Sequence, residues 1–116
     1  MSFTHTEIAE YSALIEKLVW SKRRPPLHLR GKVMEGQRIE GYEIELFLSR
    51  PHFLDSSRWI EHPIAKTRFV ISRKVWRVFW PRADMKWHRY DPQPEVPGFE
   101  EFLNLVQEDA YHCFWG

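Results

Sequence analysis

The chain has 116 residues, a net charge of +1 and one cysteine, which suits one domain and excludes an intramolecular disulfide. Aromatic residues make up 16% and charged residues 28%, a composition typical of a globular rather than a disordered protein. No apolar run approaches the length of a membrane span, and the N-terminus lacks the pattern of a signal peptide. We therefore expect a single domain over residues 1–116 that is cytoplasmic and does not enter a membrane.

The first segment of the chain predicts a helix. Thr4 and Glu7 have the spacing of a capping box, in which each side chain bonds the other residue's backbone. Apolar residues then recur at helical spacing over residues 8–19. The helix should run to about Lys22 and must end before Pro25-Pro26, because proline removes a backbone donor.

The pattern then changes to strands. Residues 32–39 and 42–50 predict a hairpin around Glu40-Gly41, and the second of these strands alternates apolar with polar side chains. Residues 51–62 are predicted to form a loop, with Trp59 as its anchor.

A second predicted hairpin joins residues 64–71 to residues 75–80, both rich in side chains that favour strands. Pro81 should interrupt the pairing, and residues 86–90 add a possible short fifth strand. The three prolines in residues 91–97 predict a stiff connector.

The last predicted element is a helix that begins at Pro97-Gly98. Glu100 and Glu101 lie in its first turn, where the helix dipole favours acidic side chains. Together the segments predict an α+β fold: an N-terminal helix, an antiparallel β meander of four to five strands, and a C-terminal helix packed on the sheet.

Charge is distributed unevenly along the chain. Residues 18–90 carry sixteen Lys and Arg against seven Asp and Glu, whereas residues 91–116 carry six acidic residues and no Lys or Arg. Such asymmetry favours an anionic partner. Acidic helices that neutralise a basic sheet within one fold would explain it equally well.

The segment between Val75 and Tyr90 interleaves three of the six tryptophans with basic residues. If this segment were extended throughout, one face would carry alternate side chains, namely Trp80, Arg82, Asp84, Lys86 and His88. Cations along the phosphates and aromatic rings under the bases are a common way to hold single-stranded nucleic acid. The candidate binding residues are Trp76, Arg77, Trp80, Arg82, Asp84, Lys86, Trp87, His88 and Arg89.

Five motifs are spread over nearly the whole chain: Arg23-Arg24-Pro25-Pro26-Leu27-His28, Pro63-Ile64-Ala65-Lys66, the run from Trp80 to Tyr90, Glu100-Glu101-Phe102-Leu103, and the ending Cys113-Phe114-Trp115-Gly116. Together they resemble a small bacterial family filed as domain of unknown function 3024. The resemblance implies a short, stand-alone bacterial protein with one domain. It implies no activity, cofactor or partner.

Two other functions fit some of the residues. Trp, Tyr and Arg are enriched at protein interfaces, so a protein-interaction or inhibitor-type domain is the main alternative. Asp84-Met85-Lys86 also matches the (Asp/Glu)-x-Lys half of a nuclease motif, although roughly one such tripeptide is expected by chance in this composition. Metal-dependent cleavage would further require a second carboxylate beside Asp84, such as Glu43 or Glu45.

The remaining candidate ligands indicate no metal or cofactor, because the six histidines and the single cysteine show no metal-ligand spacing. Most of the tryptophans should fill the core. The sequence therefore favours a non-enzymatic module with a basic, tryptophan-rich sheet surface that contacts nucleic acid, in an oligomeric state that the pattern leaves open.

Overall fold

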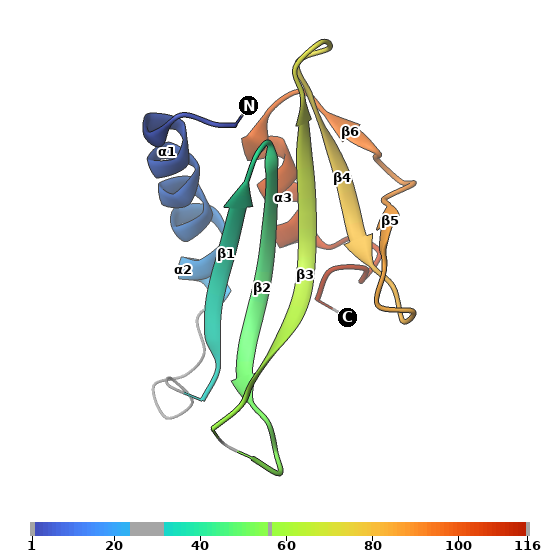
Figure 1. Cartoon of the computed structure of the whole chain (residues 1–116). Coiled ribbons are helices and arrows are strands. Elements are labelled where there is room, and N and C mark those ends of the chain that lie inside the picture. The colour runs from blue at the N-terminus through green and yellow to red at the C-terminus, as the bar shows by residue number, and fades with distance from the viewer. Residues whose placement is uncertain (1, 24–31, 56, 116) are drawn as a thin grey trace.

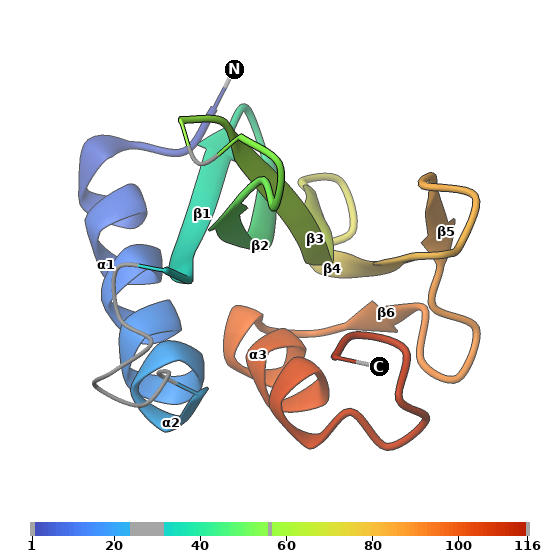
Figure 2. The same ribbon diagram turned by 90° about the horizontal axis from the view of Figure 1, so that it is seen from below.

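The computed structural model describes residues 2–23, 32–55 and 57–115. It confirms the α+β fold, with an N-terminal helix, an antiparallel sheet and a C-terminal helix. The helices lie on one face of the sheet and leave the other face open, as Figure 1 and Figure 2 show. Within the described ranges, no helix has the length and apolar character needed to cross a membrane.

Helix α1 (His5–Ile15) begins with the predicted capping box. The Thr4 hydroxyl accepts a hydrogen bond from the Glu7 backbone N–H at 3.1 Å, and the Glu7 carboxylate accepts one from the Thr4 N–H at 2.9 Å. Two N–H groups that a helix start leaves unpaired are thus satisfied locally, which explains why the sequence alone located this terminus.

The helix does not continue in α geometry to Lys22. It widens into a π-helical turn, η1 (Glu16–Trp20), and ends in the short α2 (Ser21–Arg23). The wider turn carries Val19 and Trp20, which are both buried, so tertiary packing outweighs the ideal helical repeat here. The expected stop at Pro25-Pro26 lies outside the described residues.

The sheet has six antiparallel strands in the order β1-β2-β3-β4-β5, with β6 also paired to β4. The strands are β1 (Met34–Glu40), β2 (Glu43–Pro51), β3 (Trp59–Val70), β4 (Val75–Pro81), β5 (Trp87–Arg89) and β6 (Glu95–Val96). The predicted meander is confirmed and gains one strand, because part of the proline-rich connector pairs with β4.

The prediction of a loop over residues 51–62 is wrong in its second half. Strand β3 begins at Trp59, which pairs with Pro51, and the β2–β3 ladder shifts register once, where Leu46 and Phe47 face Ala65 and Pro63. A bulge accommodates a proline inside a strand, which the local pattern does not reveal. Trp59 is exposed and anchors nothing in the core.

The hydrophobic core lies between the sheet and the helices. Alternate residues of β2 and β4 point toward it, including Ile44, Leu46 and Val78. Helix α3 (Phe99–Glu108) covers them with its buried stripe of Phe99, Phe102, Leu103 and Val106. The acidic first turn of α3 points away from this stripe, which agrees with the predicted amphipathic helix.

The aromatic tail after α3 docks against the rest of the domain over its described residues. Asp109 ends α3 in a left-handed conformation and is buried. Its carboxylate accepts hydrogen bonds from the backbone N–H groups of Phe114 at 3.0 Å and Trp115 at 2.9 Å. The Trp115 indole in turn donates to the carbonyl of Val106 at 2.8 Å. The tail is therefore fixed by one buried acid that satisfies two donors.

Candidate nucleic-acid interface at the β4–β5 edge

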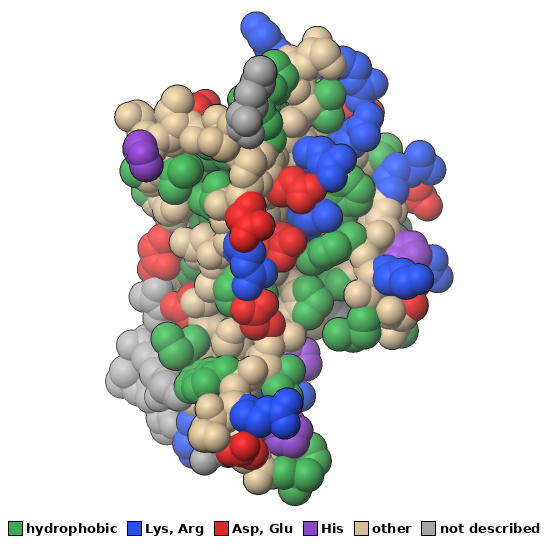
Figure 3. All heavy atoms as spheres, viewed as in Figure 1, with side chains coloured by type: hydrophobic (Ala, Val, Ile, Leu, Met, Phe, Trp, Pro, Cys, Tyr) green, Lys and Arg blue, Asp and Glu red, His purple; other side chains and the backbone are tan. Residues whose placement is uncertain are grey.

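The open face of the sheet carries a network of ion pairs rather than a uniformly basic surface, and Figure 3 shows acidic and basic side chains alternating along it. Arg38 pairs with Glu45 at 3.2 Å and with Glu61 at 2.8 Å. Arg68 pairs with Glu43 at 2.6 Å. These carboxylates belong to strands β2 and β3, not to the acidic helices that the sequence offered as the neutralising groups.

Unpaired cations gather instead at the β4–β5 edge of the sheet. Arg77, Arg82 and Lys86 are exposed and form no ion pair with any carboxylate in the described ranges. Arg89 pairs with Asp91 at 2.8 Å, but both side chains are more than 70% exposed, at 72% and 77%. Such exposed pairs contribute little energy, so the Arg89 guanidinium remains available to another anion.

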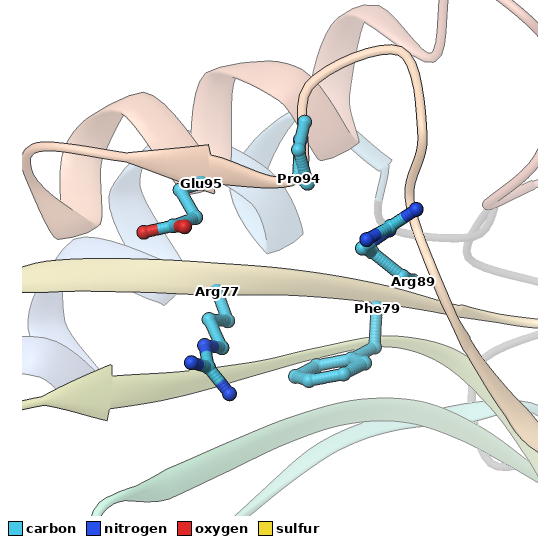
Figure 4. Close-up of a pocket in the computed structure, with 5 residues that line it drawn as sticks. All are labelled: Arg77, Phe79, Arg89, Pro94 and Glu95. Atoms are coloured by element: carbon cyan, nitrogen blue, oxygen red, sulfur yellow. The ribbon is translucent and has the colours of Figure 1, made fainter.

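A pocket of about 300 Å³ lies at this edge on the open face, and Figure 4 shows its lining. Arg77 and Phe79 extend from β4 on the same side, and Arg89 faces Phe79 across the β4–β5 pairing. Glu95 also lines the pocket, but Arg73 holds its carboxylate. Two guanidinium groups and one aromatic ring therefore line the same pocket.

Lys66 links this pocket to a second ring. Its ammonium lies 5.2 Å from the ring centre of Phe79 and 5.4 Å from that of Trp87, and its side chain is only 13% exposed. The same ammonium is 4.0 Å from the Glu43 carboxylate. Burial of the lysine stem between two rings holds both rings on the open face. We call Arg77, Phe79, Trp87 and Arg89 the edge site.

The side chains from Trp80 to His88 do not follow one extended strand, because the chain turns at its centre. Arg82 and Lys86 are joined by a backbone hydrogen bond of 3.2 Å, and Met85 has a φ of 65°. Asp84 accepts hydrogen bonds from the Lys86 N–H at 3.0 Å and from the His88 ring at 2.8 Å. These bonds hold the pKa of Asp84 below its usual value, and the bond from the Lys86 backbone has the largest effect. Asp84 thus stabilises a turn.

Trp76 belongs to the core, so we remove it from the candidate binding residues. It is 4% exposed, and its indole packs against aromatic rings 4.9 to 5.6 Å away, namely Phe3, Tyr11, Phe69 and Phe99. The pleat explains this placement, because Trp76, Val78 and Trp80 share the inner side of β4, whereas Arg77 and Phe79 share the outer side.

The nuclease alternative gains no support from the geometry around Asp84. Its carboxylate bonds the turn backbone and His88, while Glu43 and Glu45 pair with cations on the sheet. Within residues 2–23, 32–55 and 57–115, no three His, Cys, Asp or Glu side chains converge closely enough to hold a metal ion. Neither Glu43 nor Glu45 shares a contact with Asp84 among the described residues, so the second carboxylate that cleavage would require is not supplied by these two residues.

A search against family models decides the relationship that the motifs suggested. The model described as Domain of unknown function (DUF3024) matches residues 3–116. The chain belongs to this family. No curated protein and no solved structure matches it. The family assignment therefore covers the whole fold, and the chemistry of this DUF3024 protein must be argued from its own residues.

Sequence reasoning missed Phe79, which is a member of the edge site, and Lys66, which contacts its ring. The alternation of β4 carried part of the signal, because Arg77, Phe79 and Pro81 are two residues apart. Only the β3–β4 register, which places Lys66 opposite Phe79, shows that the lysine joins them. Pairing between strands is not encoded in the spacing along one strand, so Lys66 could not be assigned beforehand.

Acid pH is expected to weaken this sheet face through Glu43. Hydrogen bonds from Arg68 hold the pKa of Glu43 below its ordinary value of 4.5. Its stabilisation is therefore complete above that value and is lost as the pH falls through the lower folded pKa. Glu43→Gln should cost about 0.5–1 kcal/mol at neutral pH and flatten the acid limb of the stability profile.

Urea unfolding from neutral pH down to the acid transition measures this effect. Glu10→Gln serves as the control, because Glu10 is an exposed acid of α1 without an ion pair among the described residues. An acid limb equally steep in Glu43→Gln and in the wild type would contradict the role of the Arg68–Glu43 pair.

Proposed function

We propose that this protein is a non-enzymatic cytoplasmic module that binds nucleic acid at the edge site. The observation that supports this function best is the lining of one pocket by two guanidinium groups, Arg77 and Arg89, together with the Phe79 ring. A guanidinium forms two parallel hydrogen bonds with a phosphate, and an aromatic ring stacks on any base. The guanidinium groups therefore suit the phosphate of a nucleotide, and the ring suits its base.

Charge availability also favours this edge over the rest of the sheet. Cations that already bind carboxylates, such as Arg38 and Arg68, would have to give up those partners to bind a phosphate. Arg77 and Lys86 form no ion pair among the described residues, and Arg82 interacts with the Asp84 carboxylate only beyond ion-pair distance. The binding surface is therefore small, and it contacts a few phosphates rather than a long backbone.

The small surface predicts a shallow salt dependence. With three or four phosphates neutralised, the logarithm of the affinity for a single-stranded oligonucleotide should fall with the logarithm of salt with a slope of about −2 to −3. Fluorescence anisotropy of a labelled oligothymidylate, titrated at several salt concentrations, measures the slope. Absence of binding at low salt, where phosphate contacts are strongest, would refute the proposed function.

A second candidate function, protein binding, is favoured by apolar side chains in a turn away from the edge site. Phe53 is 88% exposed and Leu54 is 79% exposed, in the turn between β2 and β3. His52 accepts a hydrogen bond from the Leu54 N–H at 3.1 Å, so this turn has a defined shape. Size-exclusion chromatography of the wild type and of Phe53→Ser with Leu54→Ser tests for self-association. A monomer in both cases would count against it.

A further inference from the structure

A second pocket lies on the other face of β5. Its volume is about 340 Å³, and its lining consists of Trp80, Arg82, His88, Arg89 and Asp91. Trp80 and His88 face each other across the β4–β5 pairing, on the side opposite to Phe79. The guanidinium of Arg82 lies 5.7 Å from the centre of the Trp80 ring. An aromatic ring and a cation thus recur here, as in the first pocket.

Strand β5 separates the two pockets, and Arg89 lines both. The strand is only three residues long. Figure 2 shows that it lies beyond the helices, at the end of the sheet away from α1, so its inner side is not covered by them. His88 retains 33% side-chain exposure on that side, which agrees with an open position.

We infer that a single-stranded nucleic acid passes over the edge of β5, with one base on Phe79 and another on Trp80. This inference rests on the proposed function and specifies its ligand. Arg89, which reaches both pockets, would contact the phosphate between them, and Arg82 the next phosphate on the Trp80 side. A duplex does not fit this path, because its bases are already stacked and the two rings lie on opposite faces of the sheet.

The path predicts an effect of Trp80 that depends on ligand length. Thymidine monophosphate can occupy only one of the two pockets at a time, so Trp80→Leu or Arg82→Ala should weaken its binding less than the binding of a longer strand. For oligothymidylates of about four or more nucleotides, each variant should weaken binding about five- to tenfold, since one stacked base or one phosphate contact is lost. Phe79→Leu should weaken binding at every length.

Anisotropy or calorimetric titrations with a series of oligothymidylates measure this dependence. Trp59→Leu is the matched control, because Trp59 is an exposed tryptophan at the far end of β3 and should have no effect at any length. Because Trp80 packs partly against the core, thermal unfolding of Trp80→Leu is compared with the wild type, and the exposed Arg82→Ala provides a second, independent test.

The possible results separate the two claims. Oligonucleotide binding that is equally strong in the wild type, Trp80→Leu and Arg82→Ala at every length would overturn the path over β5 and leave the proposed function standing. Tighter binding of a duplex than of the single strand would overturn the path as well. Absence of binding by the wild type to every probe would refute both the path and the proposed function.

Discussion

Simultaneous replacement of Arg77 and Arg89 by alanine is expected to weaken binding of a single-stranded oligonucleotide roughly 100-fold, at about 1.4 kcal/mol for each guanidinium. Both groups line the pocket that contains Phe79, and neither is held by a buried carboxylate. Loss of Arg89 also leaves Asp91 without its cation, which adds repulsion toward phosphate. The salt slope should become shallower by about 1.4, because two phosphate contacts disappear.

The matched control for this variant removes two charges elsewhere. Arg50 and Arg58 are exposed and form no ion pair among the described residues, and they lie near the turn between β2 and β3, away from the β4–β5 pairing. Arg50→Ala with Arg58→Ala should therefore change the affinity less than threefold or so, through the net charge alone. Equal losses in the two double variants would show that binding follows net charge and not the edge site.

The second large effect concerns stability. Trp76→Ala is expected to lower the free energy of unfolding by about 3–5 kcal/mol, because it empties the centre of the aromatic cluster. The Trp76 ring contacts four other rings, two on strands or the N-terminal segment and two on helices, so it joins the sheet to both helices. A domain of this size has a total stability of only about 5–15 kcal/mol. Urea unfolding followed by far-ultraviolet circular dichroism measures the loss.

Two further variants distinguish a core role from a binding role. Trp76→Phe retains an aromatic ring and should lose less stability than Trp76→Ala, while the folded protein binds oligonucleotide as the wild type does. Trp87→Ala should show the converse, with a small loss of stability and weaker binding, because Trp87 is half-buried on the open face beside Lys66. Weaker binding by Trp76→Phe without a loss of stability would return Trp76 to the binding residues.

The ion pairs of the sheet determine how much of the basic central region is available to a ligand. In the Arg68–Glu43–Lys66 group the carboxylate neutralises one of the two positive charges, and the half-buried lysine also holds Phe79 and Trp87 in place. The network therefore supports the edge site without competing for the ligand. It also explains why a count of basic residues overestimates the basic surface.

Several features followed from the sequence alone because short-range interactions determine them. The capping box of Thr4 and Glu7, the alternation along β2 and the apolar stripe of α3 each involve residues fewer than about five positions apart, or one repeating spacing. These patterns specify an element's type and its buried side. They were sufficient for the α+β fold and for the order of its main elements.

Other features depended on which strands pair and in what register. Trp76 and Phe79 lie three positions apart in one strand, yet one belongs to the core and the other to the edge site, because the pleat reverses side chains at every residue. The turn at Asp84 reversed the direction of the chain, so Trp80 and His88 lie opposite each other across the β4–β5 pairing instead of following one another along one strand. Lys66 reached the site only across the ladder between β3 and β4. The sequence by itself thus determined the elements and their apolar sides. Tertiary pairing decided which cations have no carboxylate partner and which rings line a pocket with them.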